Sequence, residues 1–399
     1  MISSGNHKSL KENLIPQDWN LINSPILPLF LTALIYFTFI MLCLERYNFD
    51  FSRFVWAGKL FVDPEHAPKN LFIRDDCGYD GQFYYRLSLD PFTCKQTDFG
   101  IKIDSPIYRQ QRILYPLVIW SLSFGNHKLV PINMVLLNFI AICAMGWMGG
   151  RYLKENGLHA YFGVVFPLCS GFIFSLTRDL CEILEISLLM YAFLLFKRKK
   201  VFLSSLFLTL SILTKETAFI VVWAAFILYF INKLFQFRNN IKWFFPLIPG
   251  CVFVIWHAHL YWAWSGYNII YDIKNNMGYP LVGFIKHFIF MNPAHYEGSP
   301  IYFFEMCLII LFSIVVVYSC FNSNVEILEK VSWFNYLIFV FCLTGSVWNW
   351  DSAYLRALSE FFLLGLIIII DSKSWFKKPV MLVVCILWFV KAIWCLYFV

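Results

Sequence analysis

Long apolar runs alternate with short polar connections along most of the chain, and one long polar segment follows the first run. About 20 apolar residues are enough to cross a hydrocarbon layer of roughly 30 Å. Each run should be helical, because lipid satisfies no backbone hydrogen bond. The pattern predicts an all-α polytopic membrane protein with about 11 transmembrane helices. The candidate spans are 26–45, 129–148, 158–176, 177–196, 201–213, 217–235, 243–264, 300–320, 333–348, 355–371 and 379–398.

Two apolar segments are short for spans. The run 201–213 could cross only where the bilayer is thinned or where its polar end opens into a cavity. The segment 113–124 follows Arg109 and Arg112, which is typical of a helix lying in the membrane interface. The pattern alone leaves open whether either segment spans.

Loop 46–112 is mixed in charge and, at over 60 residues, reports weakly on orientation. The other connections fall into two sets with very different Lys and Arg content. One set carries most of their cations: Lys8, Lys11, Arg151, Lys154, Lys197, Arg198, Lys199, Lys200, Lys233, Arg238, Lys242, Lys330, Lys373, Lys377 and Lys378. The other carries Arg178, Lys215 and Arg356 in short turns, with Lys274 and Lys286 in a longer loop. Cytoplasmic connections are enriched in Lys and Arg. We therefore predict a multi-pass protein of the cytoplasmic (inner) membrane with its N-terminus inside and its C-terminus outside.

Composition agrees with a membrane protein. Hydrophobic residues make up 59% of the chain, charged residues make up 14%, and the formal net charge is +7. The cation-rich connections account for this charge, because they would face an anionic lipid leaflet. Membrane lipid is thus the expected partner, and no nucleic acid is needed. We expect one integral membrane domain over 1–399, with a cytoplasmic tail (1–25), a first outer loop with interfacial helices (46–128) and a second outer loop (265–299).

The first outer loop contains the densest cluster of functional groups. Its segment 75–86, Asp-Asp-Cys-Gly-Tyr-Asp-Gly-Gln-Phe-Tyr-Tyr-Arg, holds three acids, four aromatic residues and two glycines. The residues from Asp80 to Leu89 predict a short helix that ends before Pro91, because a residue preceding proline is disfavoured in the helical region. A chain with few charges that gathers them in one loop is expected to use that loop for chemistry.

The acids and tyrosines of this segment also have structural interpretations. Asp80 could be the N-cap of the short helix, with its carboxylate accepting backbone hydrogen bonds. Asp75 and Asp76 could be solvated loop acids, and Tyr84 and Tyr85 could belong to an interfacial aromatic belt. A capping carboxylate can also be catalytic, so the structural and functional interpretations of Asp80 do not exclude each other.

The motif Gly-Tyr-Asp-Gly-Gln-Phe-Tyr-Tyr-Arg-Leu (78–87), then Asp-Pro (90–91), Tyr-Arg (108–109) and Arg-Ile-Leu-Tyr-Pro (112–116), resembles a bacterial family of multispanning proteins linked to cell-surface glycopolymers. It also resembles the GT-C class of membrane glycosyltransferases, which place an essential acid in the first outer loop. A looser likeness exists to the GPI-anchor mannosyltransferases. The close match covers only 78–116, and the chain lacks the Asp-Glu pair, the His-Pro-Asp-Glu string and the large soluble domain of some GT-C members.

Three short outer turns each place a cation beside an acid at the end of a span. They contain Arg178, Asp179 and Glu182; Lys215 and Glu216; and Asp351, Arg356 and Glu360. Charged groups at such depth usually pair or line a cavity, because each costs about 2.5–3.5 kcal/mol to insert. A pocket for a lipid phosphate would use several cations. The alternative is structural pairs between neighbours: Asp179 for Arg178, Glu216 for Lys215, and Glu360 or Asp351 for Arg356.

Other candidate groups are weaker. His257 and His259 are two residues apart and do not share a helix face, so we predict no metal site from them. His287 and His295 lie in the second outer loop, which could cover a pocket. Cys77 and Cys94 could pair in an oxidising compartment. No glycine-rich phosphate loop, Cys-x-x-Cys pair or Gly-x-Ser-x-Gly motif is present, and we expect no cofactor, although a divalent metal is compatible with the chemistry.

Together with the resemblance, these features predict a glycosyltransferase that moves a sugar from a polyprenyl-phosphate donor to a glycan or lipid acceptor at the outer membrane face. Asp80, or alternatively Asp76, would act as general base, and a single displacement would invert the anomeric carbon. Arg178, Lys215 and Arg356 would stabilise the leaving phosphate. The other expected substrate-binding residues are Gln82, Tyr84, Tyr85, Arg109, Arg112, Asp179, Glu216 and Asp351. A transporter or flippase for lipid-linked glycans, which should show internal repeats, and a glycan polymerase are the alternatives.

Overall fold

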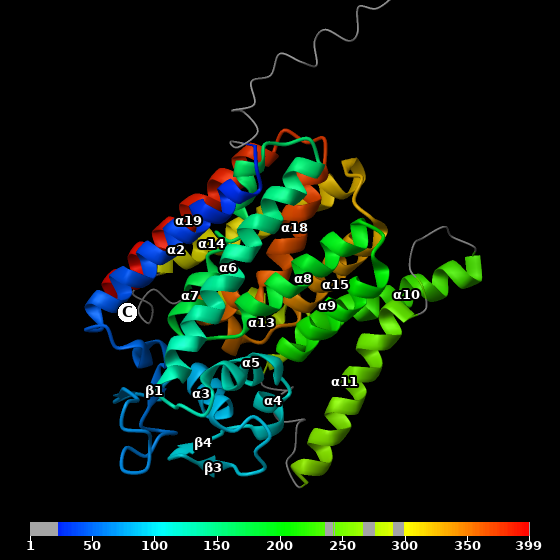
Figure 1. Ribbon diagram of the computed structural model, residues 1–399. Helices are drawn as coiled ribbons and strands as arrows, with labels where there is room; N and C mark the ends of the chain where they lie inside the picture. The colour runs from blue at the N-terminus through cyan, green and yellow to red at the C-terminus, as the bar shows by residue number, and fades with distance from the viewer. Residues whose placement is uncertain (1–22, 236–241, 243, 266–275, 290–298, 399) are drawn as a thin grey trace, which may run out of the picture.

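The computed structural model describes residues 23–235, 242, 244–265, 276–289 and 299–398. Its main body is a bundle of helices, and the first outer loop forms a layer of short elements across one end of that bundle (Figure 1). The predicted tail 1–25 and most of the second outer loop, including His295, lie outside the described residues. The helices of the bundle are α2 (Ile26–Arg46), α6 (Leu129–Glu155), η2 (Ala160–Val165), α7 (Gly171–Thr177), α8 (Glu182–Lys197), α9 (Val201–Thr214), η3 (Glu216–Ala218), α10 (Phe219–Phe235), α11 (Phe244–Ala263), α13 (Val282–Ile289), α14 (Ser299–Asn322), α15 (Ile327–Phe341), α16 (Gly345–Trp348), α17 (Asp351–Ala357), α18 (Ser359–Asp371) and α19 (Lys377–Phe398).

Within the described residues, six helical segments are long and apolar enough to cross a membrane. They are α2, α6, η3 with α10, α11, α14 and α19, and the pair α17 and α18, bent by 50°, is a seventh candidate. The structure therefore agrees with an all-α membrane protein. In the described residues, six or seven segments meet the length and composition of a span, so the prediction of about 11 spans is not confirmed; several expected spans are shorter or broken.

The differences have local causes. The expected span 158–176 is divided into η2 and α7, with Pro167 between them, and proline interrupts helical hydrogen bonding. The expected span 177–196 starts later, at Glu182, because Asp179 has a positive φ of 48° that ends helical geometry. The segment 201–213 is the 14-residue helix α9, and 113–124 is the 10-residue helix α5 (Leu114–Ser123).

The first outer loop folds into a compact layer with its own small core. Its elements are η1 (Phe51–Val55), β1 (Ala57–Gly58), β2 (Ile73–Arg74), α3 (Gly81–Leu89), β3 (Thr97–Asp98), β4 (Ile101–Lys102), α4 (Pro106–Gln110) and α5. Strand β1 pairs with β2 in parallel, and β3 pairs with β4 antiparallel. The buried side chains of Tyr84, Tyr115 and Met134 belong to one apolar cluster, which fixes α3 and α5 against α6.

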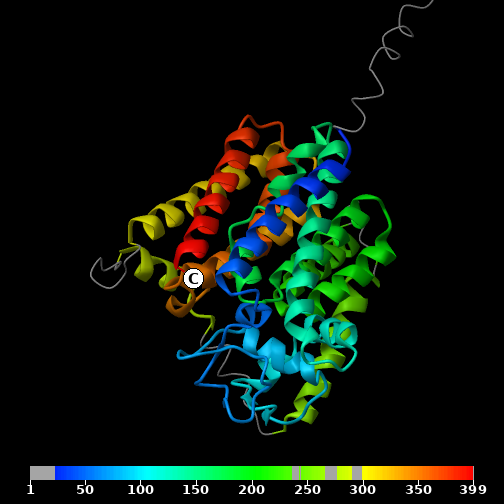
Figure 2. The same cartoon turned by 60° about the vertical axis from the view of Figure 1, so that its left-hand side comes forward.

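Cation-rich connections lie at the end of the bundle opposite the loop layer. At the end away from the loop layer, Arg198 pairs with Glu155, and Lys199 Nζ lies 2.6 Å from Glu326 Oε1. The loop layer lies at the opposite end, as both views show (Figures 1 and 2). Helix α6, with 27 residues, is about 40 Å long at 1.5 Å per residue and so connects the two ends. The cations that the sequence assigns to the cytoplasm thus gather away from the loop layer.

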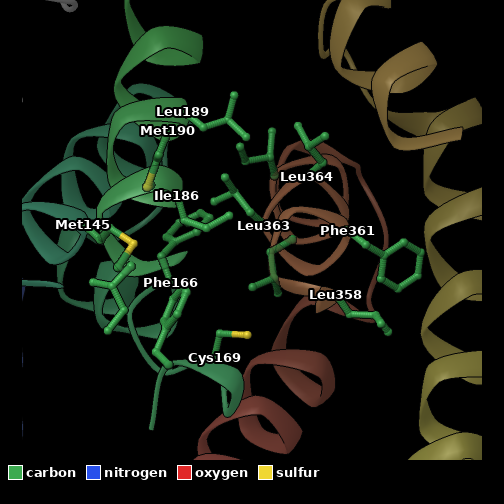
Figure 3. Close-up of a cluster of buried hydrophobic side chains, with 14 of the residues drawn as sticks. Met145, Phe166, Cys169, Ile186, Leu189, Met190, Leu358, Phe361, Leu363 and Leu364 are labelled. Atoms are coloured by element: carbon green, nitrogen blue, oxygen red, sulfur yellow. The ribbon is translucent and has the colours of Figure 1, made fainter. Parts of the chain in front are cut away.

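The core of the bundle sets the positions of the helices that carry the charged turns. Leu363 of α18 points toward Ile186 of α8, Leu364 and Leu189 lie above them in the view, and Phe361 points to the other side (Figure 3). All five side chains are at most 4% exposed. Protein interiors of this kind are close-packed and resist displacement. The packing of α8 against α18 therefore holds the starts of both helices, with Glu182 and Glu360, in fixed relation.

Candidate functional site

Asp80 precedes the short helix α3, but it does not cap it. Its backbone is already helical, with φ −56° and ψ −26°, and its side chain makes no capping hydrogen bond. The N-cap interpretation of Asp80 is therefore wrong. The carboxylate instead faces two arginines from distant parts of the chain.

The residues beside Asp80 fix the start of α3. Gly78 has a φ of +68°, which favours glycine, and a Cβ on Gly81 would lie 2.2 Å from the carbonyl oxygen of Arg178. The Gln82 side chain accepts a hydrogen bond from Gly58 N and donates one to Cys77 O, at 3.0 and 3.1 Å. Gln82 is 1% exposed, so its observed role is structural. The Gly-Tyr-Asp-Gly-Gln motif thus builds a rigid support for the Asp80 carboxylate.

The Asp80 carboxylate is shared between Arg109 and Arg356. Arg109 Nη1 lies 3.0 Å from Asp80 Oδ1, and Arg356 Nη2 lies 2.8 Å from Asp80 Oδ2. The other terminal nitrogen of Arg356 lies 3.1 Å from Glu182 Oε1. Arg356 therefore joins the loop layer to the start of α8.

A second set of ion pairs surrounds Arg112 and Lys215. Arg112 donates to both carboxylate oxygens of Glu216, at 2.7 and 2.8 Å, in a bidentate pair. Lys215 Nζ lies 3.2 Å from Glu360 Oε1, and the Thr217 hydroxyl donates to the same oxygen. Glu182, Glu216 and Glu360 each lie in the first turn of a helix, where the helix dipole favours a negative charge.

A cavity of about 570 Å³ connects these groups. Its charged lining residues are Arg112, Glu182, Lys215, Glu216 and Arg356, and its polar ones include Tyr108, Gln111 and His257. Its apolar lining residues include Phe253, Met277, Phe339, Leu343, Val347 and Ala357. Asp80 does not line the cavity itself but pairs with Arg356, which does. The Asp80 side chain is 18% exposed.

The arginines dominate the electrostatics of Asp80. Burial raises the pKa of its carboxyl group, but Arg109, Arg356 and Arg112 together outweigh burial and hold the pKa far below its usual range. Asp80 is thus ionised at neutral pH. A carboxylate with such a low pKa is a weak base, so it can act as a general base only after its arginine contacts loosen.

Arg178 does not join the cavity. Its guanidinium lies over the rings of Trp56, Tyr79 and Phe174, with its carbon 4.3, 4.9 and 5.0 Å from the ring centres. Asp179 is fully buried, and neither of its carboxylate oxygens has a hydrogen-bond partner among the described residues. The alternative interpretation, a structural pair of Arg178 with Asp179, is therefore wrong.

The other neighbour pairs are also wrong. Glu216 binds Arg112 and not Lys215, while Glu360 binds Lys215 and not Arg356. Asp351 belongs to a separate buried group, in which Lys391 Nζ lies 2.8 Å from Asp351 Oδ2 and 2.6 Å from Glu305 Oε1. That group fixes α17 to α14 and α19.

The remaining loop candidates differ in exposure. Tyr84 and Tyr85 are both 0% exposed, so the interfacial-belt interpretation is wrong. Asp75 pairs with Lys59, and Asp76 pairs with Arg74 at 2.9 Å, both at the surface. Asp76 thus has the environment of a solvated loop acid, and it is not part of the cavity lining.

The cysteine and histidine candidates lie in separate environments. Cys77 and Cys94 are both free and exposed. His257 Nε2 lies 3.0 Å from Gln111 Oε1, and the ring of His259 stacks on Trp256. The described part of the chain contains no group of three or more His, Cys, Asp or Glu side chains placed to hold a metal ion.

Tyr108, Gln111 and Phe253 line the cavity but were not expected from the sequence. A signal for Tyr108 exists, because Tyr108 and Arg112 are four residues apart, the spacing at which side chains meet on a helix. No comparable local signal marks Phe253, which reaches the cavity through the packing of α11. Comparisons of the chain with protein-family models, with curated proteins and with solved structures gave no match.

Proposed function

We propose that this protein is a membrane glycosyltransferase of GT-C type, which transfers a sugar from a polyprenyl-phosphate donor to a glycan or lipid acceptor. The observation that carries the proposal is the Asp80 carboxylate, held between Arg109 and Arg356 at the edge of a cavity that also contains Arg112 and Lys215. An acid beside several cations is what base-assisted displacement of a phosphate requires.

The cavity lining favours a lipid-linked donor. The lining combines the cations Arg112, Lys215 and Arg356 with apolar side chains such as Phe253, Phe339 and Leu343. A volume of about 570 Å³ lies within the usual range for small-molecule sites. An amphiphile with a phosphate head and an isoprenoid chain matches both kinds of lining residue. The membrane-spanning helices supply the bilayer in which such a donor would dissolve.

The proposed reaction is a single displacement. The acceptor oxygen attacks the anomeric carbon, its proton passes to Asp80, and the bond between the anomeric carbon and the phosphate oxygen breaks. The phosphate leaves with the bonding electrons, and Lys215 and Arg356 stabilise its added charge. The anomeric centre inverts, and protonated Asp80 later returns its proton to water.

The ion pairs of Asp80 suggest how donor binding would prepare the base. A phosphate entering the cavity competes with Asp80 and Glu182 for Arg356, because Arg binds phosphate in the same bidentate geometry as carboxylate. When Arg356 moves to the phosphate, Asp80 loses one of its two closest cations and its pKa rises. The base would therefore become effective only when the donor is present.

Topology supports the location of this chemistry. The cation-rich connections lie at the bundle end opposite the loop layer. By the positive-inside rule, the loop layer and the cavity would face outward from the cytoplasmic membrane. This orientation gives an N-terminus inside and a C-terminus outside.

The test is transfer by the purified protein in proteoliposomes. A panel of radiolabelled polyprenyl-phosphate sugars would be supplied with membrane extracts as the source of acceptor, and products would be separated from unreacted lipid. We expect one donor to yield a labelled glycan or lipid, with loss of transfer in Asp80→Asn and retention in Asp76→Asn. Translocation of the lipid without transfer by the wild-type protein would instead identify a flippase.

The 50° bend between α17 and α18 is the feature that favours this alternative, because transporters often use broken helices at their binding sites. The bend follows directly after Arg356 and Ala357, which line the cavity. The transporter hypothesis leaves the placement of Asp80 between two arginines without a purpose. The enzyme hypothesis explains both features, because the bend brings Arg356 to Asp80.

A further inference from the structure

Tyr108 lines the cavity, and its hydroxyl binds Arg112, which lines the same cavity. It lies on α4, and its hydroxyl oxygen accepts a hydrogen bond from Arg112 Nη2 at 2.8 Å. The Arg109 and Arg112 guanidinium carbons lie 5.2 and 4.7 Å from the centre of its ring. Two cations and one hydrogen bond therefore hold this ring in place.

The hydrogen-bond inventory of Tyr108 leaves its proton available. A guanidinium can only donate, so the bond from Arg112 occupies an oxygen lone pair of Tyr108 and not its O–H group. In the described part of the chain, the bond from Arg112 is the one hydrogen bond of this hydroxyl. Among the described residues, no hydrogen bond joins the Tyr108 hydroxyl to the nearby Glu216 carboxylate, whose oxygens accept from Arg112. An acceptor for the Tyr108 proton would therefore come from whatever occupies the cavity.

We infer that Tyr108 donates a hydrogen bond to an anionic phosphate oxygen of the bound donor. This inference rests on the proposed function. The Tyr108 hydroxyl would be an uncharged hydrogen-bond donor in a site whose cations are largely neutralised by acids. Arg112 strengthens the bond, because donation from a cation polarises the hydroxyl and makes it a better donor. Four of the five N–H groups of Arg112 bind Glu216 and two tyrosines, so Arg112 acts on the phosphate mainly through Tyr108.

Tyr84 offers a matched control. Its hydroxyl oxygen accepts from the other terminal nitrogen of Arg112 at 2.6 Å, so it supports Arg112 as Tyr108 does. Tyr84 is 0% exposed and is not part of the cavity lining, and its hydroxyl lies 3.5 Å from Cys181 Sγ. Tyr84→Phe and Tyr108→Phe each remove one hydrogen-bond acceptor from Arg112. Only Tyr108→Phe also removes a hydroxyl that could donate a hydrogen bond into the cavity.

The test is binding of two probes of equal chain length, a short polyprenyl phosphate and the corresponding polyprenyl alcohol, to the purified full-length protein. We expect Tyr108→Phe to weaken phosphate binding roughly 10- to 100-fold, as for loss of a hydrogen bond to a charged group. Binding of the alcohol should not change. Tyr84→Phe should retain phosphate affinity within about threefold of wild type, because the Tyr108 hydroxyl is still present to donate a hydrogen bond.

The outcomes separate this inference from the proposed function. Wild-type affinity of Tyr108→Phe for the phosphate probe would overturn the role of Tyr108 while leaving the donor site intact. Equal losses in Tyr84→Phe and Tyr108→Phe would mean that both residues only hold Arg112, which also overturns it. Failure of the wild-type protein to prefer the phosphate over the alcohol would overturn the phosphate site as a whole. Thermal unfolding of each variant shows whether it is folded, and Tyr108→Leu provides a second variant without the hydroxyl.

Discussion

Asp80 and Arg356 are separated by 276 positions in the chain, yet their side chains form an ion pair of 2.8 Å. Asp80 belongs to the loop layer, and Arg356 belongs to α17, next to the bend that leads into α18. Glu182 shares the same guanidinium, at 3.1 Å. One arginine therefore links the loop layer, the start of α8 and the cavity wall, and an anion that attracts it would alter all three.

Asp80→Asn tests the proposed base. The amide keeps the size of the side chain but cannot take up a proton, so we expect transfer to fall by about 10²–10⁴-fold. Asp76→Asn is the control, because Asp76 is a loop acid of the same segment that pairs with Arg74 at the surface. Initial rates with saturating donor give the comparison. Full activity in Asp80→Asn, or a larger loss in Asp76→Asn, would remove Asp80 from this role.

The pH dependence of transfer tests whether the donor prepares the base. The profile of kcat/KM reports the free enzyme, in which the arginines keep the pKa of Asp80 below its usual value. Asp80 should therefore cause no loss of kcat/KM above about pH 4, the ordinary pKa of an aspartate. In the donor complex Arg356 is drawn away, so the acid limb of kcat should lie at higher pH.

Arg356→Gln supplies the control for this prediction. The variant lacks one of the cations that lower the pKa of Asp80, so this pKa should rise. As pH is lowered, kcat/KM of the variant should therefore begin to fall at a higher pH than kcat/KM of the wild type. Identical acid limbs in kcat and kcat/KM for the wild-type protein would contradict preparation of the base by the donor. Rate profiles at constant ionic strength, from acid to neutral pH, are the measurement.

The helical plan of the bundle could be predicted from the sequence, whereas the broken segments could not. Helices α2, α6, α14 and α19 lie close to the expected spans, because a continuous apolar run allows few alternatives in a membrane. The division of 158–176 depends on tertiary packing. A Cβ on Gly163 would lie 2.1 Å from the backbone nitrogen of Gly150, so η2 rests directly on α6 at this point. Hydropathy does not report such contacts.

For the site, the sequence indicated the residues but not their partners. It marked Asp80, Lys215 and Arg356: Asp80 pairs with Arg356, Lys215 pairs separately with Glu360, and Lys215 and Arg356 both line the cavity. The alternative of structural pairs between neighbours was wrong because adjacent residues at a helix start point in different directions. Lys215 and Glu216 accordingly bind Glu360 and Arg112, on opposite sides of the turn. Long-range partners of this kind follow from the fold and not from local spacing.

The Lys215–Glu360 pair provides a double-mutant test of the phosphate pocket. Lys215→Gln leaves Glu360, which is 0% exposed, without its cation, and we expect a loss of about 3–5 kcal/mol in stability. Lys215→Gln with Glu360→Gln removes both charges and should restore thermal stability. Donor use should stay low in the double variant if Lys215 also binds the phosphate. Recovery of full transfer would show that this pair only supports the fold.

Gly81→Ala tests whether the position of Asp80 depends on the close contact between α3 and the chain at Arg178. The added Cβ would lie 2.2 Å from Arg178 O and 2.7 Å from Val55 O, so α3 must shift. We expect a stability loss of about 1–3 kcal/mol, typical of overpacking, together with reduced transfer. Gly345→Ala is the matched control, because a Cβ there meets no atom within 4 Å. Equal behaviour of both variants in unfolding and transfer assays would show that this contact does not position Asp80.

Two native thiols allow a direct test of orientation. Cys77 and Cys94 are free and exposed in the loop layer. If that layer faces outward, a membrane-impermeant maleimide should label the protein in intact cells, and Cys77→Ser with Cys94→Ser should abolish the labelling. Adding Lys199→Cys to that background places a thiol in the cation-rich connection at the far end, and it should react only after permeabilisation. The reverse pattern would place Asp80 in the cytoplasm, where water-soluble activated sugars are available, and would remove the reason for a lipid-linked donor.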